Sequence, residues 1–112
     1  MPIDTLRSFA LSLPDVTEDL PFGPDTLAFR VNGKIFMLLA MDEVPVRFNV
    51  KAEPEKALMQ REEYEDILPG YHMNKKHWNT VVTGGGVPLR VMKELIEDSY
   101  HLVAKTKKTS RK

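Results

Sequence analysis

Residues 27–41 read LAFRVNGKIFMLLAM, and this stretch decides the fold. Large apolar residues occupy every second position from Leu27 to Val31, which is the period of a β-strand with one buried face. Asn32-Gly33 follows and supplies the two left-handed positions of a type I′ turn. The mostly apolar run Lys34 to Met41 then continues as a second strand. The stretch therefore predicts a β-hairpin of two antiparallel strands.

The chain after the hairpin predicts a third strand and a helix. Asp42 and Glu43 mark a turn, and alternation resumes from Val46 to Lys51, with basic and polar side chains on the open face of this strand. Pro54 suits the first turn of a helix, and apolar residues at helical spacing continue until the helix ends before Pro69-Gly70.

The last third of the chain predicts two short strands and a long helix. The strands are Tyr71 to Asn74 and His77 to Thr83, and Gly84-Gly85-Gly86 ends them in a flexible turn. Pro88 opens the final helix, whose broad apolar face reaches about residue 104. Ser99 falls in the middle of this helix, where its hydroxyl is expected to bond to the preceding turn.

The residues before the hairpin predict a helix and an irregular connection. Apolar residues recur at helical spacing from about residue 3 to residue 12, and Pro14 stops the pattern. Asp15 to Asp25 is rich in proline and reads as an ordered connection, in which Phe22 is expected to be a buried anchor.

These elements define the expected fold class. Their order is α-β-β-β-α-β-β-α, which predicts a two-layer α+β domain with an antiparallel five-stranded sheet and helices on one face. With 112 residues, 42% of them hydrophobic and 29% charged, the chain suits one folded domain with one core. We expect a single domain over residues 1–104 and a basic, disordered tail over residues 105–112.

Composition limits the compartment and the chemistry. The chain has no cysteine, which excludes disulfides, thiolate nucleophiles and cysteine-ligated metal sites and favours a cytoplasmic location. The N-terminus lacks the basic and apolar regions of a signal peptide. The longest apolar run, Ile35 to Met41, is far shorter than the roughly 20 residues that span a bilayer, so a soluble protein with no membrane partner is expected.

The net charge of zero conceals an asymmetry. Five basic residues and no acidic ones lie in Lys105 to Lys112, which leaves 11 basic against 16 acidic residues in the rest of the chain. Two interpretations of the tail stay open, a solvated end or a segment that touches phosphate or an acidic protein.

The densest group of functional residue types lies between Pro69 and Thr80. Lysines offer cations to phosphate, amides reach polar edges and aromatic rings allow stacking. The candidate binding residues of this block are His72, Asn74, Lys75, Lys76, His77 and Trp78. The alternative is that Tyr71 and Trp78 are core anchors and that the lysines decorate a solvated turn.

A second candidate set lies on the first three strands. Arg30, Lys34, Arg47 and Lys51 fall where alternation places them on the sheet face opposite the helices, forming a stripe suited to a polyanion. The alternative is ordinary cross-strand pairing with carboxylates.

Metal binding, cofactor binding and catalysis find little support. His72 and His77 are five residues apart, which suits neither one face of a strand nor the i, i+4 spacing of a helix. No serine lies in a nucleophile elbow, and Gly84-Gly85-Gly86 is not followed by the lysine of a phosphate loop. We therefore expect no enzyme activity, no metal and no cofactor.

Several short blocks together resemble the MmcQ/YjbR family over nearly the whole chain except the tail. The blocks are Leu13 to Val16, Pro21 to Gly23, Gly33 to Phe36, Tyr71 to Asn79 and Ser99 to Val103. The resemblance implies an α+β domain with a five-stranded antiparallel sheet, comparable to secretion-chaperone and frataxin-like folds. It also implies DNA binding through a proposed double-wing arrangement, and it carries no catalytic residues.

The sequence thus predicts a non-catalytic binding module whose partner is DNA. The acidic body argues against strong nonspecific affinity, so any DNA site must be a local patch. The alternative is a chaperone-like module that binds a protein partner or a second copy of itself, with no role in nucleic-acid binding.

Overall fold

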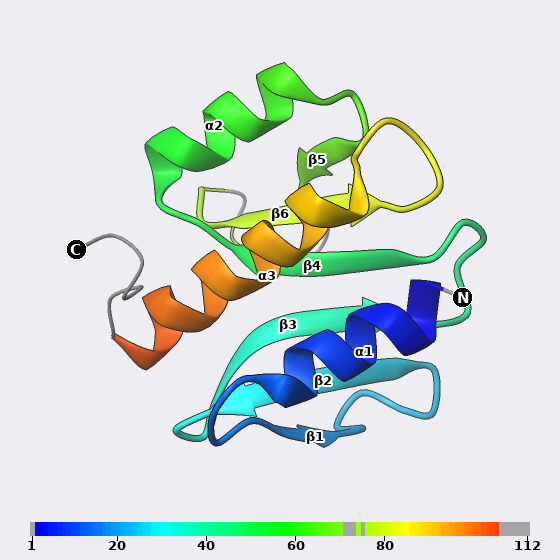
Figure 1. The fold of residues 1–112 in the computed structure, drawn as a ribbon, viewed down its shortest axis with the longest axis vertical. Helices are drawn as coiled ribbons and strands as arrows, with labels where there is room; N and C mark the ends of the chain where they lie inside the picture. The colour runs from blue at the N-terminus through cyan, green and yellow to red at the C-terminus, as the bar shows by residue number, and fades with distance from the viewer. Residues whose placement is uncertain (1, 71–73, 75, 106–112) are drawn as a thin grey trace.

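The computed structural model describes residues 2–70, 74 and 76–105, and the side chain of Pro2 is outside this description. Nine helices and strands occur within these residues (Figure 1). In chain order they are α1 (Pro2–Ser12), β1 (Thr17–Asp19), β2 (Thr26–Val31), β3 (Lys34–Ala40), β4 (Arg47–Lys51), α2 (Pro54–Glu63), β5 (Ile67–Pro69), β6 (Trp78–Val82) and α3 (Leu89–Ala104). The strands form one antiparallel sheet in the order β1-β2-β3-β4-β6-β5.

The predicted hairpin is confirmed. Asn32 and Gly33 both have positive φ, 55° and 78°, and they connect Val31 directly to its partner Lys34. The register then shifts, because Phe29 pairs with Met37 while Arg30 pairs with Ile35. Phe36 is therefore the extra residue of a β-bulge in β3, and the bulge lets Phe36 and Met37 both be fully buried.

The α+β class is confirmed, but the sheet has six strands within the described residues, so the prediction of five was wrong. Thr17–Asp19 pairs with β2 where an irregular connection was expected. The second helix ends at Glu63 instead of continuing to Leu68, and Ile67–Pro69 pairs with β6 as strand β5. The strand predicted from Tyr71 to Asn74 falls largely outside the described residues, and Asn74 itself is in no strand.

All three described helices cover the same face of the sheet (Figure 1). α3 crosses β3 and β4 at the centre, α1 packs beside α3, and α2 covers β5 and β6. The core between the layers is built from alternate strand residues and from the apolar face of α3. Its largest fully buried apolar side chains are Phe29, Phe36, Phe48, Leu6, Met37, Leu39, Ile67 and Ile96. None of the described helices is long and apolar enough to cross a bilayer.

Phe22 is not an anchor. Its side chain is 65% exposed, so the expectation that it would be buried was wrong. The connection is held by other contacts: Arg7 of α1 forms an ion pair with Glu18 of β1. Tyr100 donates a hydrogen bond of 2.7 Å to the main-chain oxygen of Pro14.

Ser99 links α3 to two strands instead of bonding within its own helix. Its buried hydroxyl donates to the main-chain oxygen of Phe36 at 2.6 Å and accepts from the main-chain N–H of Lys51 at 2.8 Å. Paired strands normally satisfy such groups themselves, but the ladder between β3 and β4 ends at the pair of Met37 and Val50, one position before Phe36 and Lys51. The prediction of a local hydrogen bond for Ser99 was therefore wrong.

The glycine turn before α3 is tied to the body of the domain. The main-chain N–H of Gly86 donates to Asp66 Oδ2 at 2.9 Å, and Asp66 accepts a second bond from Val82 through its main-chain oxygen. A Cβ atom on Gly85 would lie 2.0 Å from Asp66 Oδ2. A side chain at Gly85 would therefore displace the carboxylate of Asp66 from its bond to the turn.

Candidate functional site

In the part of the chain that the structure describes, no helix covers the second face of the sheet, which we call the open face. The register places three rows of side chains across it, and one of them consists of Thr26, Ala40, Arg47 and Val82. The central row is polar in its middle, where Thr80 donates a hydrogen bond to Asn49, and apolar beside it at Leu38 and Leu68. The third row contains Arg30 and Ile35 on β2 and β3, then Lys51 and Trp78 on β4 and β6.

Lys51 and Trp78 are direct cross-strand partners on the open face. Both side chains are partly exposed. Gly70, which follows β5, donates a main-chain hydrogen bond to Trp78, and a Cβ atom on Gly70 would lie 2.9 Å from the Cβ atom of Trp78. No salt bridge joins Lys51 to a described carboxylate. Trp78 therefore belongs to the open face and not to the helix-covered core that the alternative interpretation assigned to it.

Arg30 lies on the open face as expected, but its charge is already paired. Its Nε donates to Asp19 Oδ1 at 3.0 Å, and its Nη1 donates to the main-chain oxygen of Gly33 at 3.3 Å. Asp19 comes from β1, the strand that the sequence pattern did not indicate. Cross-strand pairing thus lowers the positive potential that Arg30 offers to a ligand.

Arg47 lies on the open face at the opposite end of β4 from Lys51, four residues or about 13 Å away along the strand. Its Nε atom is buried and makes no hydrogen bond, and the carboxylate of Glu43 is 4.0 Å from it. Arg47 and Lys51 therefore share a face without forming one compact cluster.

Lys34 is not on the open face, so its predicted placement was wrong. It pairs with Val31, whose side chain belongs to the helix-covered core. Since cross-strand partners point to the same side of a sheet, Lys34 projects toward the helix side at the end of the hairpin. The basic stripe predicted from four residues is reduced to Arg30, Arg47 and Lys51.

The candidate block between Pro69 and Thr80 is described only in part. His72 and Lys75 lie outside the described residues. Asn74 shapes the turn: its side chain accepts from the N–H of Lys76 at 3.0 Å, and its main-chain oxygen accepts from His77 and Trp78. His77 accepts a hydrogen bond from Ala52 through its main-chain oxygen. Both residues therefore have structural contacts that set the position of Lys76.

Asn79, the last residue of the Tyr71 to Asn79 block, has a structural role in this region that its residue type alone does not indicate. It is fully buried on the helix-covered side of β6, where its Nδ2 donates to the main-chain oxygen of Ala57 at 3.2 Å and to Gln60 Oε1 at 3.0 Å. Its Oδ1 accepts from Arg61 Nε at 2.7 Å. The signal that could have found it is alternation, because Asn79 and the buried Val81 share one face of the strand.

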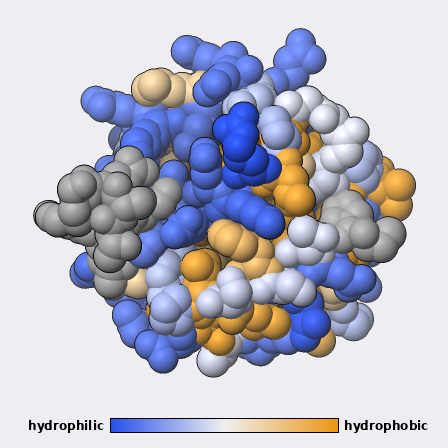
Figure 2. All heavy atoms as spheres, in the orientation of Figure 1, coloured by the Kyte–Doolittle hydropathy of each residue, from blue (hydrophilic) through white to orange (hydrophobic). Residues whose placement is uncertain are grey.

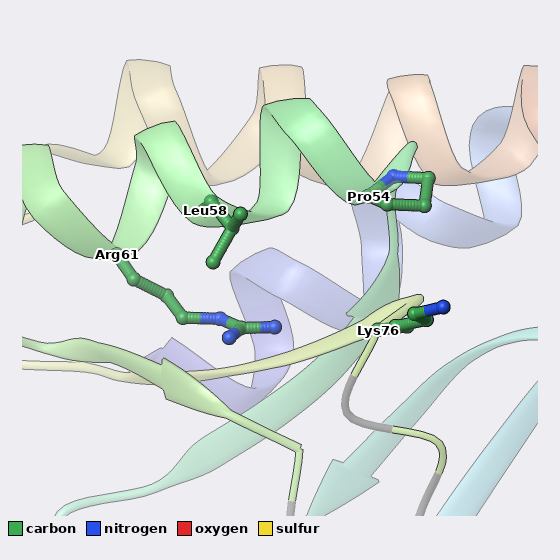
Figure 3. A pocket seen from close by; sticks show the side chains of 4 residues that line it. All are labelled: Pro54, Leu58, Arg61 and Lys76. Atoms are coloured by element: carbon green, nitrogen blue, oxygen red, sulfur yellow. The ribbon is translucent and has the colours of Figure 1, made fainter.

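Lys76 lies against α2, away from the open face. Together with Pro54, Leu58 and Arg61 it lines a hollow with a volume of about 280 Å³ (Figure 3). The helix side of the molecule is largely hydrophilic around α2, and apolar side chains reach the surface in smaller groups elsewhere (Figure 2). Among the described basic candidates, Lys76 thus lies beside α2, whereas Arg30, Arg47 and Lys51 lie on the open face.

Among the described residues, Arg7 and Tyr100 have shifted pKa values, and neither lies on the open face. The hydrogen bond to Glu18, together with its charge, raises the pKa of Arg7. Burial, followed by the charge of Asp15, raises the pKa of Tyr100 above its ordinary value of 10.0. The described residues contain no group of three or more histidine or carboxylate side chains placed to hold a metal ion. The groups that the open face offers for binding are cationic side chains, the indole ring of Trp78 and the amide of Asn49.

Proteins of known sequence and structure share this fold. A family model described as YjbR matches residues 11–102. The Escherichia coli O157:H7 protein YbdF is 44% identical over 101 residues, which cover 89% of this chain and 82% of YbdF. The Escherichia coli K12 protein YjbR is 26% identical over 100 residues, 89% of this chain and 85% of that protein. Both relatives are named as uncharacterized proteins.

Two solved structures agree with the architecture. A Deinococcus radiodurans protein with the family-model domain DUF419 superposes with a TM-score of 0.87 at 37% identity, over 96% of this chain and 83% of that one. A Pseudomonas syringae crystal structure gives a TM-score of 0.79 at 30% identity, over 92% and 99% of the two chains. The resemblance found in the sequence is confirmed, and the chain belongs to the YjbR family.

Proposed function

We propose that this chain is a non-catalytic, cytoplasmic nucleic-acid-binding module that holds its ligand on the open face. The observation that carries the proposal is the cross-strand pair of Lys51 and Trp78 on a sheet face that no described helix covers. A lysine beside an indole ring offers a cation to phosphate and a surface on which a base can stack.

The geometry favours a single strand over a duplex. Bases that stack on aromatic side chains of an exposed sheet must be unpaired, as in other sheet-based readers of single-stranded nucleic acid. Asn49 lies beside this pair on the same face and is partly exposed, so its amide can reach a base edge, while the buried Thr80 donates to Asn49 and orients it. The acidic balance of residues 1–104 and the pairing of Arg30 with Asp19 predict weak binding. Because the open face neutralises few phosphates, its affinity should depend only shallowly on salt.

The test is fluorescence anisotropy of labelled single-stranded and duplex DNA with the full chain at about 50 and about 200 mM salt. Lys51→Gln should weaken single-strand binding and reduce the slope of log affinity against log salt by about 0.7. Trp78→Leu retains apolar volume but removes the stacking surface, and it should cost about 1 to 3 kcal/mol of binding free energy. Lys56→Gln on the exposed surface of α2 is the matched control.

Two further variants separate the other candidate contacts. Substituting glutamine for Lys107, Lys108, Arg111 and Lys112 measures the attraction of the basic tail, and Lys76→Gln measures the turn beside α2. If binding survives both Lys51→Gln and Trp78→Leu in folded protein, the open face is not the site. If DNA binding disappears when only the tail cations are substituted, the binding is a nonspecific attraction between the tail and the phosphates.

A protein partner is the second candidate, and the apolar residues of the open face favour it. Ile35, Leu38 and Val82 are only partly buried there, and a chaperone-like module of the secretion-chaperone or frataxin type would use such a surface to dock a polypeptide. Light scattering after size-exclusion chromatography tests the version in which the partner is a second copy. A monomer at all concentrations would remove that version.

A further inference from the structure

The amide of Asn49 lies on the open face between the two cations of β4. Arg47, Asn49 and Lys51 are alternate residues of one strand, so their side chains point to the same side at intervals of about 7 Å. Trp78 is the diagonal neighbour of Asn49 on β6, at a separation of about 7 to 8 Å that a large ring can bridge. A base that stacks on the indole can therefore present one of its edges to Asn49.

Thr80 fixes which end of this amide faces a ligand. Its hydroxyl donates to Oδ1 of Asn49, which is its direct cross-strand partner. Nδ2 of Asn49 carries two N–H donors, and it has no hydrogen-bond partner among the described residues. Only 3% of Thr80 is exposed, whereas Asn49 is partly exposed, so a ligand meets the amide N–H groups and not the hydroxyl.

The opposite orientation of the amide is unfavourable. If Nδ2 were turned toward β6, the Thr80 hydroxyl would accept from it, and the hydroxyl proton would lose the acceptor that Oδ1 of Asn49 provides. A buried donor without an acceptor is destabilising, because it gives up its bond to water and gains none in return. The buried threonine therefore holds the amide with its N–H groups toward the solvent.

An amide that offers mainly donors selects bases by their acceptors. Thymine, cytosine and guanine each carry a carbonyl oxygen that accepts a hydrogen bond, and adenine carries none. Paired recognition of adenine by asparagine needs the amide oxygen to accept from the exocyclic amino group while the amide nitrogen donates to the ring. Oδ1 of Asn49 already accepts from Thr80, so this paired contact is disfavoured.

We propose that Asn49 gives the open face a preference for single strands whose bases carry a carbonyl oxygen, and that Thr80 is the positioning residue that disfavours adenine. This preference rests on the proposed nucleic-acid function and names the class of base that the same site accepts. Lys51 contacts phosphate and Trp78 stacks on any base, so neither residue distinguishes one base from another. Asn49 is therefore the residue of this group that reads the base.

The experiment is fluorescence anisotropy of the full chain with labelled thymine, cytosine and adenine octanucleotides at about 50 mM salt. The thymine strand should bind about 5-fold more tightly than the adenine strand, which is the effect of about one neutral hydrogen bond. The cytosine strand should bind as the thymine strand does. Adenine strands also differ in how strongly they stack, so the decisive quantity is the change of the thymine-to-adenine affinity ratio in variants.

Thr80→Val removes the hydroxyl and keeps the shape of the side chain. The Asn49 amide can then turn and offer its oxygen as well, so adenine affinity should rise about 3-fold while thymine affinity stays within about 2-fold. Thr26→Val is the matched control, because Thr26 is a partly exposed residue in a different row of the open face. It should leave the ratio unchanged.

Asn49→Asp replaces the donors by an acceptor that adenine and cytosine can satisfy with their amino groups and thymine cannot. All affinities should fall because of the added negative charge, and the adenine strand should now bind at least as tightly as the thymine strand. Asn32→Asp is the control, since it adds the same charge in the exposed hairpin turn, where Asp-Gly is also favourable. Circular dichroism verifies that each variant is folded.

Three results would overturn the base preference. Equal affinity of the original chain for thymine and adenine strands would do so, and it would leave the proposed single-strand site standing. A ratio that is unchanged in either Thr80→Val or Asn49→Asp would assign the discrimination to stacking alone. No binding of any octanucleotide would overturn the preference together with the proposed function.

Discussion

Ser99 in α3 donates a hydrogen bond of 2.6 Å to the main-chain oxygen of Phe36, a residue 63 positions earlier in the chain. The same hydroxyl accepts from the N–H of Lys51 at 2.8 Å, so one serine satisfies two main-chain groups that lie just beyond the last pair of the β3–β4 ladder. Lys51 is also the cation of the proposed nucleic-acid site, and its main chain is therefore anchored to the helix layer.

Ser99→Ala should lower the free energy of unfolding by about 1 to 3 kcal/mol, because it leaves a buried donor and a buried acceptor unsatisfied. Urea denaturation followed by circular dichroism measures the change. Ser12→Ala is the control, since the Ser12 hydroxyl bonds to the Phe9 oxygen on the exposed surface and should matter little. Equal effects of the two substitutions would show that Ser99 does not bridge the strands.

Gly85→Ala should destabilise the domain by about 1 to 2 kcal/mol. The new Cβ atom would lie 2.0 Å from Asp66 Oδ2, so Asp66 must move and give up its bond to the N–H of Gly86. Gly86→Ala meets no atom within 4 Å and should be neutral or slightly stabilising, because it restricts the unfolded chain. Thermal unfolding of the two variants checks the difference, and a neutral Gly85→Ala would contradict the close approach.

The raised pKa of Tyr100 predicts a loss of stability at alkaline pH. Burial, and then the charge of Asp15, favour the neutral phenol in the folded state, so the unfolded chain releases the proton at lower pH than the folded one. The contribution is fully present below pH 10.0, the ordinary pKa, and it is lost as the pH rises through the higher pKa of the folded state. Urea denaturation at a series of pH values measures this slope.

Tyr100→Phe is the matching variant. It should be less stable at neutral pH by about 1 kcal/mol, because the hydrogen bond to the Pro14 oxygen is lost. Its stability should fall less steeply above pH 10.0 than that of the original chain. Parallel slopes for the two proteins would assign the alkaline loss to other groups.

Phe22→Ala should change the free energy of unfolding by less than about 0.5 kcal/mol, since the ring is 65% exposed. Phe29→Ala removes a fully buried ring and should cost about 3 to 5 kcal/mol. Chemical denaturation compares them directly. A large cost at Phe22 would mean that the ring packs against something in solution, such as a second copy.

The parts of the fold that could be predicted from sequence are those with strong local signals. The hairpin has the Asn32-Gly33 pair, whose two residues readily adopt the positive φ angles that the turn requires. The apolar residues of α3 recur at helical spacing over 16 residues. β1 and β5 have three residues each, which is too short for a period to be seen, and they form only because longer neighbours pair with them. Hence two strands were missed or misplaced while the α+β class was correct.

The candidate site was predictable where strand alternation alone decides the face. Arg30, Arg47 and Lys51 lie where alternation places them, whereas Lys34 directly follows the turn and takes the face of its partner Val31. The pairing of Arg30 with Asp19 and the network around Asn79 join residues that are 11 to 22 positions apart. Such contacts depend on how the layers pack, and no local pattern reveals them.

The two edge strands of the sheet limit how this protein can aggregate. Among the described strands the outermost are β1 and β5, each three residues long, and β5 ends at Pro69, which has no N–H to donate. Edge strands this short offer few unpaired main-chain groups to another β-strand and disfavour fibril-like stacking. Any assembly of this protein should therefore use side-chain surfaces, and an additional strand should not extend the sheet.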